Sequence, residues 1–527
     1  MRTRRVGVLA LVVALSLVVA ACSGEPNEGN GATGENAGKI TIAMQEDVRS
    51  PDNLLMSGTT TDRLMLGSTV YEPLFTTDER GGIQPALATE AASSEDLLTW
   101  TITLREGVTF SNGKHFTAAD VIANFDAFRN PDNASGYASD LSNVESIEAT
   151  GDYEVVFHLA SPDAKWDTAL QDTMFISDLD AREAELLAPE EVPVGTGPYV
   201  WSTRQVGSSV TFTPNDAYWR GEPPLTQVVF RAIPDGQTAV IDLQQGSVDM
   251  MANYVPPQSL PALQSDPDIE LVAAEGSTFY QAYLNFEKDR QGGYADGAKV
   301  RQGLAHLLNP EQTVPALIGD FGVLATQPIP SWMDGFNPDI RHIPLDVEEG
   351  KRLLAEGGIN EGDPIKLLAL KDRPFMCEWA TAAQSTLVDA GYDAQLTCLD
   401  SAASTPQVTA YEWDLLFWRT SGRANAAVMY QQRWGLELAS PPTDTYTLQD
   451  PDLQSMIDEL RGSREPDAYT SLAQSIGERI VVQDVAVIPG YFDNVYFPIN
   501  KRVKGFVLSP TTWYGILYNA MGSVTTE

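Results

Sequence analysis

The sequence has few basic residues for its length. Its 527 residues include 34 lysines and arginines but 72 aspartates and glutamates, which gives a formal net charge of −38. This balance argues against nucleic acid or an anionic surface as a partner, because the body would repel both. The acidic residues fit either a solvated surface, which is the common case, or a site for a cationic ligand.

Long hydrophobic runs are missing from most of the chain. After residue 21 no apolar stretch approaches the about 20 residues that cross a bilayer, so we expect a soluble body. The one early run, residues 6–21, follows Arg2, Arg4 and Arg5. A basic start before a short apolar core predicts an export signal peptide over residues 1–21.

Cysteine occurs only three times. Cys22 directly follows the early apolar run, in a context that resembles a bacterial lipobox. This resemblance predicts cleavage before Cys22 and attachment of a diacylglycerol to the Cys22 thiol. The lipid would anchor the protein on the extracytoplasmic face of the cell membrane. Residues 23–39 carry no large hydrophobic side chain, so residues 22–39 are predicted to form a flexible, lipid-anchored linker. The alternative is an ordinary signal peptide that happens to contain a cysteine.

The other two cysteines flank a predicted β-α-β unit. Residues 365–370 and 392–398 are predicted strands, and residues 379–388 between them are a predicted helix. In a right-handed unit of this kind, the helix N-terminus and both strand C-termini lie on one edge. Cys377 and Cys398 should both lie on that edge. We expect a disulfide between them in an oxidising compartment, with two free buried thiols as the alternative.

Catalytic and metal-binding signatures are absent from the sequence. Histidine occurs four times, at scattered positions without H-E-x-x-H or a metal-ligand spacing with the cysteines. The segment "GTGPY" lacks the lysine of a P-loop and the Rossmann spacing, so it predicts a turn, and no G-x-S-x-G elbow occurs. Neither a metal nor a cofactor is expected. An exported hydrolase of peptides or glycans remains an alternative, because the two catalytic carboxylates of a glycosidase have no fixed spacing in the sequence.

Periodicity divides the body into two kinds of structure. In "LTWTITLREG", Trp100, Ile102 and Leu104 alternate with polar residues, as in a half-buried strand. Thr117 and Asp120 then resemble a capping box at the start of a helix. In the second half, helical patterns alternate with buried strands, which predicts a mostly parallel sheet. The C-terminal segment "IPGYFDNVYFPINKRVKGFVLSP" has a β-like pattern again and is predicted to rejoin the first part of the body. The chain would then cross twice between two lobes, and these two crossings would form a hinge.

Ordered segments of the body resemble one known family. In order along the chain they are "LTWTITLREGVTFSNGKHFTAADVIANFDAF", "GTGPYVW", "PNDAYWRGEPPL", "VVFRAIPDGQTAVIDLQQGSVDM", "AYLNFEKDRQGGYADGAKVRQGLAHLLN", "PLDVEEGKRLLAEGG" and "EWDLLFW". Together they resemble the extracellular solute-binding proteins of family 5, the substrate-binding lipoproteins of peptide- and nickel-type ABC importers.

The resemblance implies a fold and its domain boundaries. The implied fold is α/β with an α+β insert: a two-lobed, periplasmic-binding-protein-like fold (class II type, peptide-binding subgroup) joined by a two-segment hinge. Lobe I would comprise residues 40–72, 191–284 and 488–527. The inserted subdomain would be residues 73–190, and lobe II residues 285–487.

The resemblance also implies a function without catalysis. Such a receptor closes on a small solute, most often a peptide, and docks on ABC permease subunits. Closure would expel water and strengthen polar contacts to the ligand. We expect a monomer tethered to the membrane by its lipid. A structural envelope lipoprotein is a third option.

The loop after "EWDLLFW" is the first candidate binding region, because ligands bind beyond strand C-termini in such sheets. Peptide binders of the family often carry acids in this loop, where they capture the peptide amine. Here no acid occurs between Arg419 and Gly435. The loop instead offers hydrogen-bond donors that suit a carboxylate, a phosphate or a blocked peptide. They are Arg419, Ser421, Gly422 and Arg423. The alternative is that these arginines pair with surface acids.

Further candidate ligand residues lie beside this loop and opposite it. Trp418 either stacks on ligand or belongs to the core. The segment "EGSTFYQAYLNF" offers an edge for a bound peptide, near Ser277, Thr278 and Tyr280. Family topology also implies a ligand role for Tyr71 and Glu72, where lobe I leads into the insert.

Overall fold

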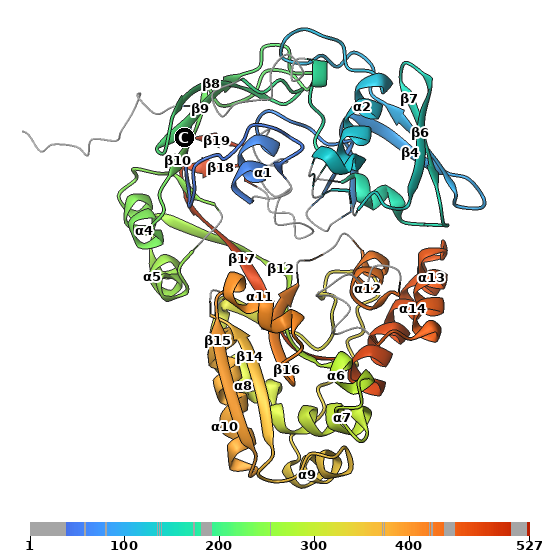
Figure 1. Cartoon of the computed structure of the whole chain (residues 1–527). Coiled ribbons are helices and arrows are strands. Elements are labelled where there is room, and N and C mark those ends of the chain that lie inside the picture. The colour runs from blue at the N-terminus through green and yellow to red at the C-terminus, as the bar shows by residue number, and fades with distance from the viewer. Residues whose placement is uncertain are drawn as a thin grey trace, which may run out of the picture. The chain divides into compact units, whose positions relative to one another are not determined.

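The computed structural model describes most of residues 38–527 as helices, strands and the turns between them (Figure 1). The described residues are 38–56, 60–78, 82–133, 135, 137–138, 140–171, 174–180, 192–252, 255–371, 373, 375–420, 422, 425–436, 448–506 and 524–526. The predicted signal peptide and Cys22 lie outside them. Lys39, assigned to the linker from sequence, is instead the first residue of strand β1. Within these ranges, no helix combines the length and hydropathy that a membrane span requires.

An eleven-stranded sheet runs through the described part of the chain. Its strand order is β15-β14-β16-β12-β17-β11-β1-β10-β9-β8, and β13 pairs with β17 off this path. The strands are β1 (Lys39–Met44), β8 (Tyr199–Gln205), β9 (Ser209–Pro214), β10 (Gln227–Ala232), β11 (Met250–Met251), β12 (Ile269–Leu284), β13 (Gly322–Leu324), β14 (Pro364–Leu370), β15 (Asp393–Leu399), β16 (Leu415–Thr420) and β17 (Val487–Asn500).

Strands β12 and β17 link the two lobes. They pair antiparallel along nearly their whole length, from Ile269 opposite Asn500 to Tyr283 opposite Val487. Near one end β17 pairs with β11 of lobe I, and near the other β12 pairs with β16 of lobe II. Figure 1 shows both strands passing from one set of elements to the other. The pairing is irregular between Glu275 and Phe279, which places a β-bulge in the connection.

Lobe I contains β1, β8, β9, β10 and β11 and short helices that pack on them. Strand β1 alternates in burial at its start, and its side chains join a hydrophobic cluster with those of β8, β9 and β10. The other elements of lobe I are α1 (Thr60–Gly67), α4 (Gly236–Gln244), η4 (Pro257–Ser259), α5 (Leu260–Ser265), β18 (Val503–Lys504) and β19 (Thr525–Thr526).

The insert is a separate antiparallel sheet with its own core. Its strand order is β4-β5-β7-β6, and the predicted alternation in β5 is confirmed because Trp100, Ile102 and Leu104 are buried. The predicted capping box is also confirmed, with reciprocal bonds between Thr117 and Asp120 at the start of α2. The elements are β2 (Phe75–Thr77), β3 (Ile83–Pro85), β4 (Ala88–Ser93), β5 (Thr99–Leu104), α2 (Ala118–Arg129), η2 (Pro131–Asn133), β6 (Val144–Gly151), β7 (Glu154–Leu159) and η3 (Trp166–Leu170).

Lobe II is a layered α/β structure. Strands β15, β14 and β16 are parallel, as predicted, and two hydrophobic clusters fill opposite faces of the sheet. Helices α7 and α10 contribute to one cluster, and α12, α13 and α14 contribute to the other. The helices are α6 (Phe286–Arg290), α7 (Gly297–Leu308), α8 (Pro310–Ile318), η5 (Gly319–Phe321), α9 (Val347–Glu356), α10 (Met376–Asp389), α11 (Ser401–Thr409), α12 (Ala426–Trp434), α13 (Pro451–Arg461), α14 (Pro466–Glu478) and η7 (Arg479–Gln483).

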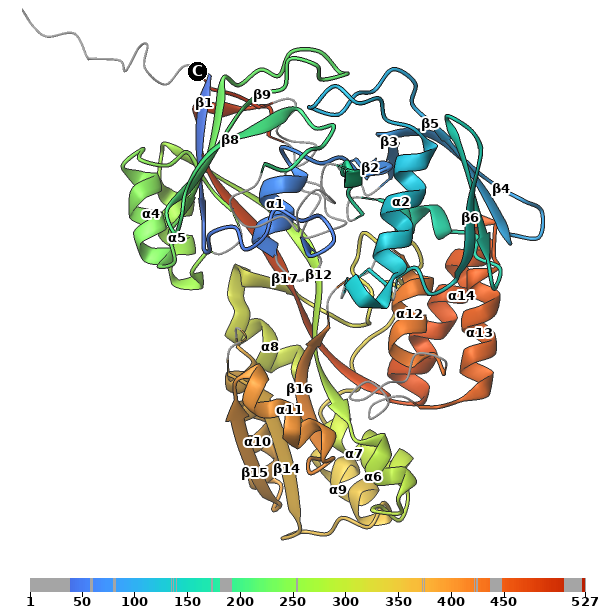
Figure 2. The ribbon, with the colours of Figure 1, turned by 45° about the horizontal axis from the view of Figure 1, so that its top comes forward.

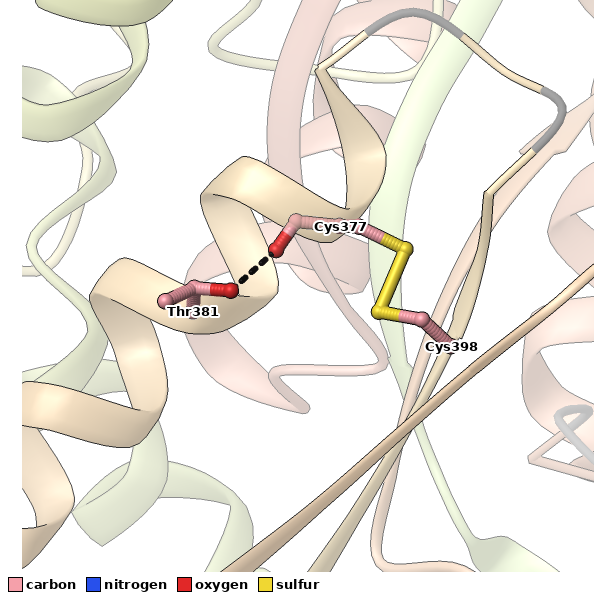
Figure 3. Close-up of a disulfide and its surroundings, with 3 residues drawn as sticks. All are labelled: Cys377, Thr381 and Cys398. Atoms are coloured by element: carbon pink, nitrogen blue, oxygen red, sulfur yellow. Dashed lines mark hydrogen bonds between the residues drawn. A yellow bond between two sulfur atoms is a disulfide. The ribbon is translucent and has the colours of Figure 1, made fainter.

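A disulfide joins the first turn of α10 to the end of β15. Cys377 and Cys398 are bonded, and their Cα atoms lie 6.0 Å apart. Figure 3 shows the bond crossing from helix to strand, with the Thr381 hydroxyl donating to the Cys377 carbonyl oxygen at 2.7 Å. The parallel pairing of β14 with β15 brings both cysteines to the edge where these strands end.

Candidate functional site

The insert contacts lobe II at a place distinct from β12 and β17. The amide of Asn425, at the start of α12, donates to the hydroxyl of Thr168 in η3 at 2.7 Å. The Arg461 guanidinium lies 3.6 Å from the Asp163 carboxylate, and the Ala164 N–H donates to the Arg461 carbonyl at 2.7 Å. Figure 2 shows the insert beside α12, α13 and α14. The two lobes are therefore linked by two strands and touch again through the insert.

This contact buries carboxyl groups. Desolvation raises the pKa of Asp163, although the charge of Arg461 opposes the rise. Desolvation also raises the pKa of Asp167 to about 6, against the charge of Lys165. The Lys165 ammonium itself lies 3.8 Å from the carboxylate of Asp334 in lobe II. The contact therefore places a desolvated carboxyl group, Asp163, against a cation of lobe II, with a second desolvated carboxyl group, Asp167, in the same segment.

The end of β16 presents two predicted ligand residues on opposite faces of the sheet. Trp418 lies opposite Gln281 of β12 and packs against the cluster under α12. Arg419 lies opposite Tyr280 on the other face. Both side chains are half-buried. Among the described residues, the Arg419 guanidinium has no hydrogen bond or ion pair, although its charge acts on Tyr280 and Asp493.

The loop after β16 packs closely on β12. A Cβ at Gly422 would lie 2.0 Å from the Ser277 hydroxyl oxygen and 2.8 Å from the Ser277 carbonyl oxygen. Only glycine permits this approach, so the loop and the bulged part of β12 lie against each other. Ser277 and Thr278 are both buried. The predicted site residues Ser421 and Arg423 lie outside the described residues.

Asp493 of β17 is a buried acid that sequence reasoning missed. It is 3% exposed, and the hydroxyl of Tyr280 lies 3.5 Å from its Oδ2. Its Oδ1 has no hydrogen-bond partner in the described part of the chain. Burial raises the pKa of Asp493 to about 7, and the nearby charge of Arg419 opposes this rise. The available signal was an acid inside an otherwise apolar strand, "GYFDNVYF".

Further groups surround this acid on the same face of the sheet. The rings of Tyr280 and Tyr491 stack with centroids 4.4 Å apart. Burial and the charge of Asp493 raise the pKa of Tyr280, whereas Arg419 and Arg373 lower it. Arg373 follows β14 and was also missed from sequence. The structure therefore brings two arginines from separate strand ends near the Tyr280 hydroxyl, and one of them, Arg419, near the buried Asp493 carboxyl group.

Tyr71 and Glu72 lie within the framework of lobe I. Both are fully buried. The Tyr71 hydroxyl donates to the Pro51 carbonyl oxygen at 2.7 Å. Glu72 accepts hydrogen bonds from Thr196 and Trp219, both at 2.8 Å, and from Tyr218 at 3.2 Å. These partners belong to lobe I. Their ligand role stays a prediction.

The contacts of Glu72 explain two of the motifs found in the sequence. Thr196 belongs to "GTGPY", and Trp219 belongs to "PNDAYWRGEPPL". In the first motif, a Cβ at Gly195 would lie 2.0 Å from the Val70 carbonyl oxygen. The motif is therefore a turn that packs on the backbone before Glu72, not a phosphate-binding loop. In the described ranges, no group of three or more histidine, cysteine or acidic residues could hold a metal.

Comparisons with known proteins agree with this architecture. Residues 82–442 match the family model described as "Bacterial extracellular solute-binding proteins, family 5 Middle". The dipeptide-binding protein of Escherichia coli is 27% identical over 468 residues, which cover 81% of this chain and 84% of that protein. Heme-binding protein A of Haemophilus influenzae is 29% identical over 303 residues. That alignment spans 53% of this chain and about half, 54%, of the relative.

A solved structure supports the fold. The structure of HbpA2 from Haemophilus parasuis superposes with a TM-score of 0.81 at 24% sequence identity, covering 93% of this chain and 100% of that chain. At this identity the likeness concerns the fold alone. The predicted fold class, two-lobed and periplasmic-binding-protein-like with an α+β insert, is confirmed.

Proposed function

Because the chain belongs to family 5 of the bacterial extracellular solute-binding proteins, we propose that it captures an oligopeptide between its lobes and delivers it to an ABC permease. The dipeptide-binding relative, aligned over 84% of its length, supports a peptide cargo. The relatives named above are binding proteins, which supports a receptor rather than the exported hydrolase that the sequence left open.

The proposed location of the binding site depends on the environment of Arg419. Arg419 is a half-buried cation without an ion pair among the described residues, in a chain with 72 acidic and 34 basic residues. Its charge acts on the buried Asp493 without a direct ion pair, so an anionic group of the cargo would supply a direct partner. The end of β16 and the loop after it therefore suit an anionic group of the cargo, with donors from Arg419, Ser421, Gly422 and Arg423.

The proposed mechanism is ligand-coupled closure. Two strands, β12 and β17, connect the lobes, and the bulge between Glu275 and Phe279 lies within that connection. Rotation about it would bring the insert onto α12 and α13, in the contact between Asp163 and Arg461. Closure would remove water from the cargo and strengthen its polar contacts.

The binding test combines two measurements. Mass spectrometry of material released from gently purified protein should identify an intact, anionic cargo, and cleaved products would favour the hydrolase. With that cargo, calorimetry should show that Arg419→Ala and Arg423→Ala each weaken binding by about tenfold or more, since each removes a charge-assisted hydrogen bond. Unchanged affinity in both variants would reject the assigned site.

The proposed location is the extracytoplasmic face of the cell membrane. Export through residues 1–21, a diacylglycerol on Cys22 and a flexible linker would hold a monomeric receptor near its permease and raise its local concentration there. Replacing the anchor by Cys22→Ser should shift the protein from the membrane fraction to the soluble fraction. Continued fractionation of this variant with membranes would contradict the anchor.

A further inference from the structure

Gln281 is an unusual residue in the middle of β12. Its side chain is fully buried. Neither its amide nitrogen nor its amide oxygen has a hydrogen-bond partner in the described ranges. Buried side-chain polar groups are paired in most native proteins, so an amide with both ends unpaired requires an explanation.

A second unpaired polar group lies beside it. Thr420 is 3% exposed, and its hydroxyl also has no partner among the described residues. In the antiparallel register, Gln281 is opposite Trp418 and Phe279 is opposite Thr420. Gln281 and Thr420 are therefore diagonal neighbours on one face of the sheet, within reach of a common small group.

The described strand residues beside this pair are uncharged. Phe279 and Phe492 belong to its hydrophobic cluster, and Trp418 packs against it. Arg419 follows Trp418 in β16 and lies opposite Tyr280, so it faces the other side of the sheet. The end of β16 thus separates a charged side, with Arg419 and Asp493, from a neutral polar side, with Gln281 and Thr420.

The neutral pair lies close to the place where the lobes meet. Five residues after Thr420, Asn425 caps α12 and donates to Thr168 of the insert. Gly422, in the same loop, packs on Ser277 of β12. A group bound beside Gln281 would therefore lie next to the contact that the lobes make in this conformation.

We propose that Gln281 and Thr420 form a subsite for an uncharged part of the cargo that carries both a hydrogen-bond donor and an acceptor. A carboxamide or a peptide amide is the matching group, because the Gln281 amide offers one donor end and one acceptor end. Trp418 supplies a flat wall beside it. An ion is a poor fit, since this face offers no opposite charge to compensate its desolvation. The inference rests on the proposed peptide-receptor function.

The first test uses the ligand-free protein. Gln281→Leu removes an unpaired buried amide, so the thermal midpoint should stay the same or rise. Gln327 is a matched control: it is fully buried in the same lobe, but its amide bonds both the carbonyl and the N–H of Asn337, at 2.8 and 3.2 Å. Gln327→Leu should lower the midpoint. An equal loss in both variants would show that Gln281 has structural partners and would overturn the subsite.

The second test measures selectivity by calorimetry with three alanine tripeptides, whose central residue is glutamine, glutamate or leucine. The wild type should bind the glutamine peptide about tenfold more tightly than the other two. Gln281→Leu should abolish this preference, Thr420→Val should reduce it, and Gln327→Leu should retain it. These results would support the subsite.

Different results would contradict the proposed subsite and the proposed receptor function. Binding of all three peptides with equal affinity, or an unchanged preference in Gln281→Leu, would overturn the subsite and leave the receptor function standing. Binding of none of the tripeptides by the wild type would contradict the peptide cargo and overturn the subsite with it.

Discussion

At the scale of single residues, carboxyl groups show how environment decides role. Glu72 is fully buried, and three side-chain donors of lobe I compensate its burial. It therefore holds the backbone together where lobe I leads into the insert. Asp493 is nearly as buried, but one of its oxygens has no partner among the described residues. The sequence marked Glu72 as a ligand residue and passed over Asp493.

The raised pKa of Asp493 predicts a pH-dependent contribution to stability. Its pKa is about 7 in the folded protein against 3.8 for an ordinary aspartate. Between these values the folded state holds a proton that the unfolded state releases, so stability falls as pH rises, by up to about 1.4 kcal/mol per pH unit. Above pH 7 this slope ends.

The variant Asp493→Asn should lack this slope. We expect urea unfolding at pH 5, 6, 7 and 8 to show that the difference between wild type and variant changes in favour of the variant as pH rises toward 7. All other titrating groups are common to both proteins, so the difference isolates Asp493. A difference that is independent of pH would contradict the raised pKa.

At the scale of elements, the β14-α10-β15 unit shows what periodicity can predict. The predicted helix at residues 379–388 is α10 (Met376–Asp389), and the predicted second strand at 392–398 is β15 (Asp393–Leu399). The apolar pattern fixed both elements to within a few residues, because each buries one face against the same core. The rule for right-handed crossovers then placed both cysteines on one edge.

The disulfide on that edge should contribute to stability. It closes a loop of 21 residues in sequence, so removing it should lower the free energy of unfolding by about 3 kcal/mol. Urea unfolding of the double variant Cys377→Ala, Cys398→Ala tests this value. Added reductant should lower the stability of the wild type and leave the double variant unaffected. Peptide mapping that finds both thiols free would show that the bond does not form.

At the scale of the whole described unit, the contact between the insert and lobe II should depend on pH. Desolvation raises the pKa of Asp163, which faces Arg461 across this contact, and raises that of Asp167 in the same segment to about 6. Opening the contact would return water to these carboxyl groups. Their neighbours are Arg461 and Asp334 of lobe II and Lys165 of the insert. Because the closed conformation binds protons more tightly, lower pH should favour it.

Small-angle scattering of the ligand-free protein tests this expectation. The radius of gyration should be smaller at pH 5 than at pH 8, since protonation removes the penalty of burying the carboxylates. Asp167→Asn, which is neutral at both values, should show a smaller change. Asp334→Asn keeps both buried carboxyl groups and should respond as the wild type does. A radius that is equal or larger at pH 5 would contradict the prediction.

The candidate site was only partly predictable, for reasons visible in particular residues. The sequence marked Trp418 and Arg419 because parallel strands end near ligands. It could not show that the two face opposite sides of the sheet with different neighbours, since that depends on the register with β12. Arg373 and Asp493 gave weaker local signals, because neither belongs to a motif.

The resemblance to a known family implied the two-lobed fold. By itself, the sequence also determined the order of the predicted helices and strands and the edge that carries the disulfide. These follow from periodicity and short-range geometry, which each segment encodes locally. The tertiary structure alone decided which polar groups meet. Tyr280 and Asp493 are 213 residues apart in the chain, and the pairing of β12 with β17 brings them together. Burial and charge at the site depend on such distant pairings, so no single segment could have revealed them.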